Sequence, residues 1–138
     1  MSTYTKPLPQ MTPEMRPFWE AARRHELVVQ RCRGCGTPRF PARDICSRCL
    51  SREAEWAPVS GRGTVFSYTV MHQIYHPAFA AEVPYAVIVV ELEEGARLLS
   101  NLVGCPVGDI APGMPVEAVF EDVTPEVTLP KFRPRARR

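Results

Sequence analysis

Two Cys-x-x-Cys pairs lie close together in the first half of the chain. Cys32 and Cys35 form the first pair, Cys46 and Cys49 form the second, and ten residues separate the pairs. Each pair makes a tight turn that directs two sulfurs at one centre, and four thiolates at tetrahedral corners suit Zn²⁺. Because every corner is then a protein sulfur, no position is left for a reactive water, and such a site stabilises a fold. The spacing therefore predicts one structural Zn²⁺ per chain in a Cys₄ ribbon.

Three other interpretations of the cysteines stay open. Two disulfides would require an oxidising compartment, but the N-terminal residues show no secretory signal and favour the cytoplasm. A redox-active pair usually occurs once and on a βαβ unit, which the pattern lacks. An iron centre uses the same four ligands, so the spacing does not distinguish it from zinc. Cys105 lies far from the pairs, and we expect a small half-buried residue there rather than a nucleophile.

The pattern before the cysteines predicts a short helix. Thr12-Pro13-Glu14 combines a hydroxyl N-cap, a proline at the first position and an acid in the first turn. Apolar residues at Phe18, Trp19, Ala22 and Leu27 then make an amphipathic stripe. This stripe can pack on its own domain, or Phe18 and Trp19 can dock on a partner, since aromatic residues are enriched at interfaces.

The second half of the chain has the pattern of a small β-barrel. Fifteen prolines in 138 residues favour short strands and turns over long helices. Five short apolar or alternating segments are separated by turns: residues 64–71, 85–92, 98–103, 116–120 and 127–129. The second of these is almost continuously apolar, which predicts a central strand covered on both faces. Five such strands suit an OB-fold barrel.

These patterns divide the chain into four parts. We expect an N-terminal arm and helix over residues 1–26, a zinc ribbon over 27–58, a barrel over 59–130 and a basic tail over 131–138. No segment approaches the run of about 18 apolar residues that a membrane span needs. The predicted fold class is mainly β with an N-terminal helix, without a membrane span.

Opposite charges are segregated along the chain. Residues 23–52 carry eight arginines against two acids, a balance of +6, whereas residues 53–130 carry two arginines against eleven acids, a balance of −9. OB barrels that bind nucleic acid combine a basic groove with stacking aromatics, and a barrel this acidic would repel a phosphate backbone. A nucleic-acid-binding module is therefore the alternative function and the less favoured one.

The last eight residues include five basic ones. The simplest interpretation is a solvated tail. The other is an arm that contacts a partner protein or a CoA phosphate through Arg133 and Arg135, with Phe132 as an anchor. In the ribbon, Phe40 and Arg43 are further candidates for contact with a partner or with CoA.

No set of residues predicts an independent enzyme. His72 and His76 are four residues apart, but Pro77 places them on a loop, and no HExxH glutamate lies between them. Glu93 and Glu94 fall in a predicted hairpin turn, where adjacent acids are ordinary solvated charges. A nucleophile, a base and an orienting group do not occur together anywhere in the pattern.

The order of the parts resembles a known family. The helix has Phe18-Trp19, Phe40-Pro41 lies between the cysteine pairs, and then come Gly61-Arg62-Gly63-Thr64-Val65, Pro84-Tyr85 and Gly113-Met114-Pro115-Val116. Over about residues 12–130 this resembles the acyl-CoA-associated zinc-ribbon/OB-fold family, long catalogued as a domain of unknown function. The resemblance implies a rubredoxin-like ribbon with structural zinc, followed by an OB barrel. It also implies a non-catalytic subunit that stabilises a thiolase-fold partner, either a thiolase or a steroid side-chain aldolase, and helps to form its acyl-CoA site.

Overall fold

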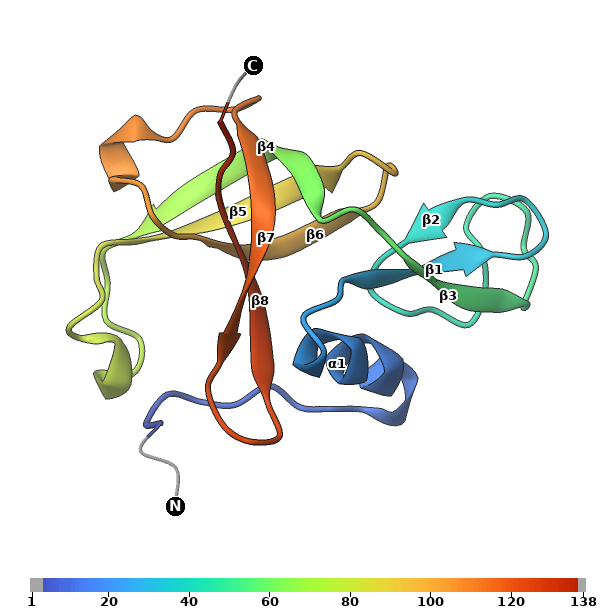
Figure 1. The fold of residues 1–138 in the computed structure, drawn as a ribbon, viewed down its shortest axis with the longest axis horizontal. Helices are drawn as coiled ribbons and strands as arrows, with labels where there is room; N and C mark the ends of the chain where they lie inside the picture. Colours follow the sequence, from blue (N-terminus) through green and yellow to red (C-terminus); the bar gives the residue numbers. More distant parts are fainter. Residues whose placement is uncertain (1–3, 137–138) are drawn as a thin grey trace.

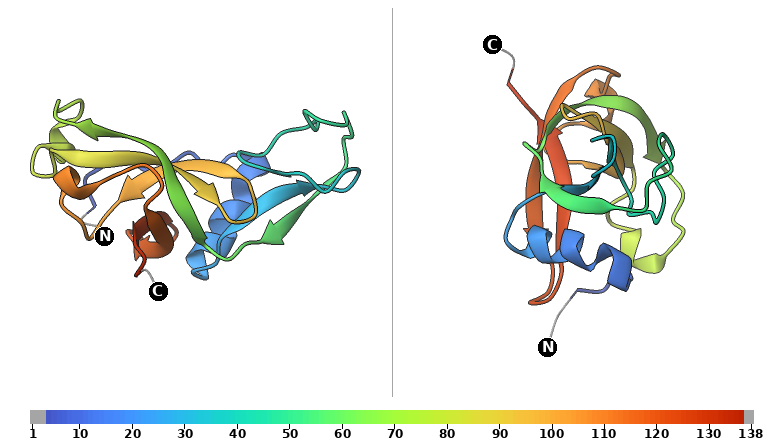
Figure 2. Two further views of the ribbon diagram at one scale, coloured as in Figure 1. Left: turned by 90° about the horizontal axis from the view of Figure 1, so that it is seen from above. Right: turned by 90° about the vertical axis from the view of Figure 1, so that its right-hand side faces the viewer.

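The computed structural model describes residues 4–136 and contains a three-stranded sheet beside a closed β-barrel (Figure 1). The two β-structures lie along the long axis of the molecule, and one helix packs beneath the junction between them (Figures 1 and 2). This arrangement confirms the predicted fold class, a mainly β chain with an N-terminal helix, a ribbon and a five-stranded barrel. No helix within residues 4–136 is long and apolar enough to cross a membrane.

The N-terminal segment forms one 3₁₀ turn and one α-helix. The turn η1 (Pro13–Met15) leads directly into the helix α1 (Arg16–Arg23). A proline occupies the first turn of each element, where backbone N–H groups have no intrahelical partner to lose. Phe18, Ala21 and Ala22 are buried, so the apolar stripe seen in the sequence faces the rest of the protein.

The ribbon is an antiparallel sheet in the order β2-β1-β3. Its strands are β1 (Val28–Cys32), β2 (Pro38–Arg39) and β3 (Ala54–Pro58). The full length of β1 pairs with β3, from Val28 opposite Pro58 to Cys32 opposite Ala54. The long excursion between β2 and β3 carries the second cysteine pair back to the end of β1, where the first pair begins.

The barrel closes in the order β4-β5-β6-β8-β7. Its elements are β4 (Arg62–Met71), η2 (Pro77–Phe79), β5 (Tyr85–Leu92), β6 (Arg97–Leu102), η3 (Val107–Asp109), β7 (Pro115–Asp122) and β8 (Thr128–Pro134). Val65, Ile88, Val90, Val116 and Phe132 are almost completely buried and fill the barrel core. At Gly63, a side-chain Cβ would collide with the carbonyl oxygen of Glu91, so β4 and β5 approach more closely there than any other residue type allows.

Strand β5 differs from the expectation of a strand covered on both faces. Its residues alternate between buried and half-buried along the whole strand. The inward set, which includes Ile88 and Val90, fills the core, whereas Val87 and Val89 lie on the outer face. The prediction was wrong because the outer face of a small closed barrel remains in contact with solvent even where its residues are apolar.

The prediction of a solvated basic tail was wrong for residues 131–134, because they belong to β8. This strand pairs with β7 from Thr128 to Pro134, and Phe132 is completely buried. The basic residues face the acids of β7: Lys131 pairs with Glu121, and Arg133 Nε lies 3.3 Å from Glu117 Oε1. The charges that suggested a tail are therefore one half of a set of cross-strand ion pairs. Residues 137–138 lie outside the described part of the chain.

A polar contact joins the helix end to the barrel. His25, which follows α1, stacks on Phe120, and its Nε2 lies 3.0 Å from Asp122 Oδ1. The buried Thr128 hydroxyl donates a hydrogen bond of 2.6 Å to the same carboxylate oxygen. The Thr128 hydrogen bond first, and then His25, lower the pKa of Asp122 below its ordinary value of 3.8.

We expect Thr128→Val to raise the pKa of Asp122 toward 3.8, because the substitution removes the largest contribution that favours the carboxylate. A carboxyl group whose folded pKa is lowered stabilises the fold above its unfolded pKa, and that contribution is lost as the pH falls through the folded pKa. The carboxyl carbon resonance of Asp122, followed by NMR between pH 2 and 6 (about two units to either side of the usual value), measures the change. An unchanged titration midpoint would contradict this assignment.

Candidate metal centre

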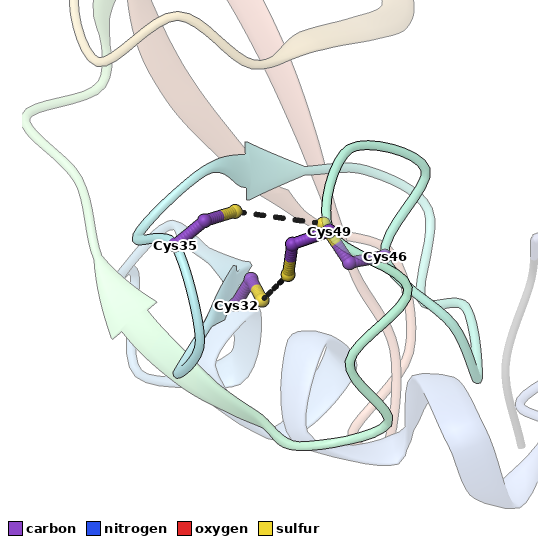
Figure 3. A group of neighbouring side chains, drawn as sticks. All are labelled: Cys32, Cys35, Cys46 and Cys49. Carbon is purple, nitrogen blue, oxygen red and sulfur yellow. Dashed lines mark hydrogen bonds between the residues drawn. The ribbon is translucent and has the colours of Figure 1, made fainter.

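The ribbon brings all four predicted ligands together. The sulfur atoms of Cys32, Cys35, Cys46 and Cys49 all lie within 4.8 Å of one another (Figure 3). The Sγ atoms of Cys32 and Cys49 are 3.5 Å apart, and those of Cys35 and Cys46 are 3.6 Å apart. Cys32 and Cys46 are buried, whereas Cys35 and Cys49 are exposed, so the group lies at the edge of the ribbon.

Both cysteine pairs adopt the same turn, here called the first and second knuckle (residues 32–36 and 46–50). In the first knuckle, the N–H of Gly36 bonds to the Cys32 carbonyl at 2.9 Å, and the N–H of Gly34 donates to the Cys32 sulfur at 3.3 Å. In the second, the N–H of Leu50 bonds to the Cys46 carbonyl at 3.0 Å, and the N–H of Arg48 donates to the Cys46 sulfur at 3.4 Å. Backbone donors thus favour the negatively charged thiolate in both turns.

Hydrogen bonds from backbone N–H groups lower the pKa of two of the four thiols. The pKa of Cys46 is lowered to about 6, first by the backbone N–H of Cys49 and then by that of Arg48. The pKa of Cys32 is lowered as well, first by the backbone N–H of Cys35. A metal-binding thiol must lose its proton, and the fold favours this at Cys46 and Cys32. At Cys49 the backbone N–H of Ser51 lowers the pKa, but the neighbouring cysteine sulfurs and burial outweigh it and raise the pKa to about 11.

The group fits a tetrahedral thiolate site. With metal–sulfur bonds of about 2.3 Å, the sulfurs of a regular tetrahedron are about 3.8 Å apart, which is close to the two shortest separations. A disulfide would require sulfurs about 2.05 Å apart, and all five cysteines within residues 4–136 are free. The four cysteines therefore could hold one metal ion with a sulfur at each of the four corners.

The other predicted site residues lie away from this centre. Phe18 is buried against Phe40, with ring centroids 4.9 Å apart, and Trp19 lies partly exposed beside it at 5.0 Å. Arg43 is exposed on the ribbon. Arg133 is paired on β8, and Arg135 Nη2 lies 4.0 Å from Glu93 Oε1.

The loop histidines and Cys105 form no second centre within the described residues. His76 Nδ1 accepts a hydrogen bond from the Ala78 N–H, which caps the short turn η2. Cys105 donates to the neighbouring Pro106 carbonyl, and burial raises the pKa of its thiol. A half-buried thiol with a raised pKa is a poor nucleophile.

Sequence reasoning missed one feature of the second knuckle. Leu50 occupies the position that Gly36 occupies in the first knuckle, and both have positive φ, 64° and 78° respectively. The sequence held a partial signal for this. Gly36 follows the first pair, and glycine is the residue best suited to the left-handed region. A comparison of the two residues that follow the pairs would have found it.

Two family models match adjoining parts of the chain. The model described as the ChsH2 rubredoxin-like zinc ribbon domain matches residues 19–55, and the ChsH2 C-terminal OB-fold domain matches residues 56–121. The first match contains all four cysteines, and the second covers most of the barrel.

Curated relatives include subunits of CoA-dependent enzymes. A protein of Thermomonospora curvata, described as a probable enoyl-CoA hydratase alpha subunit, is 43% identical over 129 residues, which is 94% of this chain and 40% of the relative. The benzoylsuccinyl-CoA thiolase subunit BbsA of Geobacter metallireducens is 35% identical over 78 residues, 56% of this chain and 51% of that subunit. This chain thus spans about half or less of the length of these two relatives.

A solved structure matches nearly the whole fold. The structure described as the Ltp2-ChsH2(DUF35) aldolase contains a chain that is 43% identical, with a TM-score of 0.83 over 92% of this chain and 98% of that one. The ribbon, the barrel and their order along the chain are therefore shared. With its Cys₄ ribbon and closed barrel, the chain belongs to the DUF35 family of ChsH2-type proteins.

Proposed function

We propose that this chain is a non-catalytic, zinc-binding accessory subunit of an acyl-CoA-processing complex with a thiolase-fold partner. The observation that carries the proposal is the close match, 43% identity and a TM-score of 0.83, to a chain of an aldolase complex. The thiolase subunit among the relatives supports the same class of partner.

In this proposal the metal is one Zn²⁺ per chain, and its role is structural. The ribbon sheet has only three short strands, and β2 has two residues, so regular strand pairing contributes little stability to the segment that carries the cysteines. Binding of four thiolates to one ion would supply the missing stability. A metal that holds the ribbon also holds the residues that the ribbon presents to a partner.

The proposed partner surface includes the junction of α1, the ribbon and the barrel. Strands β6 and β8 meet through only one residue pair, Leu102 and Phe132. Beside this seam, a largely apolar cavity of about 260 Å³ is lined by Trp19, Phe40 and Leu99, with Phe18 also in its wall. Leu99 is 67% exposed, so an apolar side chain of a partner would gain contact area here.

The part of the proposal that concerns CoA rests on the barrel edge next to β7. An open cavity of about 750 Å³ is lined by Arg62, Thr64 and Arg135, among others. Arg135 Nε is buried and has no hydrogen-bond partner within residues 4–136. Guanidinium groups with free donors suit phosphate, and we propose that this edge contributes to the acyl-CoA site.

The nucleic-acid alternative lacks a comparable observation. Phe66 is exposed on the barrel, but the Arg97 guanidinium already lies 3.8 Å from its ring centroid. That arginine also pairs with Glu91 at 2.9 Å. One face of the ring is therefore occupied and its neighbouring charge is neutralised, whereas a stacking platform needs free ring faces and a positive field.

Affinity purification of the tagged chain from its native host tests the proposal. We expect a thiolase-fold protein to co-purify in a stoichiometric amount, identified by mass spectrometry and retained through size-exclusion chromatography. Metal analysis of the same sample is expected to give one zinc per chain. A chain that purifies alone or with nucleic acid would argue against the accessory role.

A further inference from the structure

Leu50 has a backbone conformation that is unfavourable for its residue type. Its φ is 64°, in the left-handed region, where a residue with a Cβ is disfavoured relative to glycine. The equivalent residue of the first knuckle is Gly36, with a φ of 78° and the same hydrogen bond back to the first cysteine of its pair. Glycine would satisfy this position in the second knuckle as well, so the leucine is not required by the turn.

The Leu50 side chain also gains little from packing within the chain. It is 74% exposed, more than any other large apolar residue described as exposed in residues 4–136. Ile45, on the other side of Cys46, is 40% exposed. The Cys46 N–H bonds to the Ser51 carbonyl at 2.9 Å, which holds the segments carrying Ile45 and Leu50 next to each other. Two aliphatic side chains thus lie at the ribbon tip, here defined as residues 43–52.

The ribbon tip carries three arginines against one acid, Asp44. Arg43, Arg48 and Arg52 are exposed, and within residues 4–136 their guanidinium groups form no ion pair or hydrogen bond, either with an acid or with the cysteine sulfurs. By contrast, Arg31 on β1 pairs with Glu55 at 3.2 Å. The tip therefore combines an apolar centre with a rim in which arginines outnumber the one acid, an arrangement that suits a partner of the opposite charge.

We propose that Leu50, supported by Ile45, is an anchor that inserts into an apolar pocket rimmed by carboxylates on the partner protein. This inference rests on the proposed function, since the occupant is the thiolase-fold subunit. The positive φ of Leu50 and the exposure of its side chain both cost free energy in the free chain. Burial of the side chain by a partner would offset this cost. Two aliphatic residues are few for a lipid surface, and a phosphate backbone would not use them at all, so an acidic protein surface fits best.

The decisive variant is Leu50→Gly, measured in the complex with the co-purified thiolase-fold protein. We expect the zinc content to be unchanged and the melting temperature to be equal or higher, because glycine accepts the positive φ without strain. Affinity for the partner is expected to fall about tenfold or more, as for the loss of an interface anchor. Leu50→Asn, which tolerates this conformation but is polar, should lose the same affinity, and Leu50→Met should retain it.

Matched controls separate this anchor from general effects. Leu8→Gly removes another exposed leucine, 50% exposed in the N-terminal arm, and should leave the affinity unchanged. Arg48→Glu should weaken binding and reduce its dependence on salt, since it removes a cation from the rim.

The outcomes distinguish this inference from the proposed function. If the wild type binds the partner and Leu50→Gly and Leu50→Asn bind it equally well, Leu50 is not an anchor, and the accessory role stands. Failure of the wild type to bind a thiolase-fold protein overturns both. The wild type is also tested against vesicles of phosphatidylserine and phosphatidylcholine and against single-stranded RNA. If it binds either of them and Leu50→Gly does not, the assignment of Leu50 to a protein pocket is wrong.

Discussion

Cys32→Ser is expected to leave the purified protein without bound zinc and with an unfolded ribbon. Cys32 ends β1 and is buried, and its sulfur lies 3.5 Å from that of Cys49. Structural zinc sites contribute about 10–16 kcal/mol of apparent binding free energy, which is comparable to the whole stability of a typical domain, about 5–15 kcal/mol. A serine hydroxyl cannot replace a thiolate, so most of this free energy is lost with one ligand.

Elemental analysis and the circular dichroism melting curve measure this effect. Cys105→Ser is the matched control, because Cys105 hydrogen-bonds only to the adjacent Pro106 carbonyl and should keep one zinc per chain. A Cys32→Ser protein with a full equivalent of zinc, or a wild type dominated by iron, would contradict the zinc assignment. In the complex, we expect Cys32→Ser to reduce partner binding and to leave no separate chemical step altered.

Phe132→Ala is expected to unfold the barrel or to destabilise it by about 3–5 kcal/mol. The Phe132 side chain is completely buried between β6 and β7, opposite Ala118 and beside Leu102. Its removal leaves a large cavity at the seam where β8 closes the barrel. Urea unfolding followed by tryptophan fluorescence measures the loss.

Arg133→Ala provides the comparison for this prediction. Arg133 is the next residue along β8, is exposed, and pairs with Glu117 at 3.3 Å. Exposed ion pairs contribute about 0–1 kcal/mol, so this variant should unfold almost as the wild type does. Equal unfolding midpoints for Phe132→Ala and the wild type would mean that residues 131–134 do not form the closing strand.

Local patterns in the sequence predicted most of the ribbon and the metal centre. The four cysteines are close in sequence, and each knuckle is defined by its own five residues, so spacing alone predicted that the four sulfurs would lie together. Their mutual distances depend on the pairing of β1 with β3, two strands that are separated in sequence by β2 and by the long excursion that carries the second cysteine pair.

The errors concern contacts between residues distant in sequence. The basic residues after Pro130 looked like a tail because their acidic partners, Glu117 and Glu121, lie on another strand. The outer residues of β5 looked buried because a run of apolar residues does not indicate which face solvent reaches. In both cases the sequence pattern is local, whereas the burial depends on how the barrel closes.

The position of β8 between β6 and β7 has a consequence for the order of synthesis. The ribbon sheet is complete once Pro58 has been made, whereas the barrel lacks its closing strand until Thr128–Pro134 has been translated. Because domains fold as units while the chain emerges, we expect the ribbon to take up its metal while β6 and β7 still have open edges. Zinc supply during translation, rather than after it, would then set the yield of correctly folded chains.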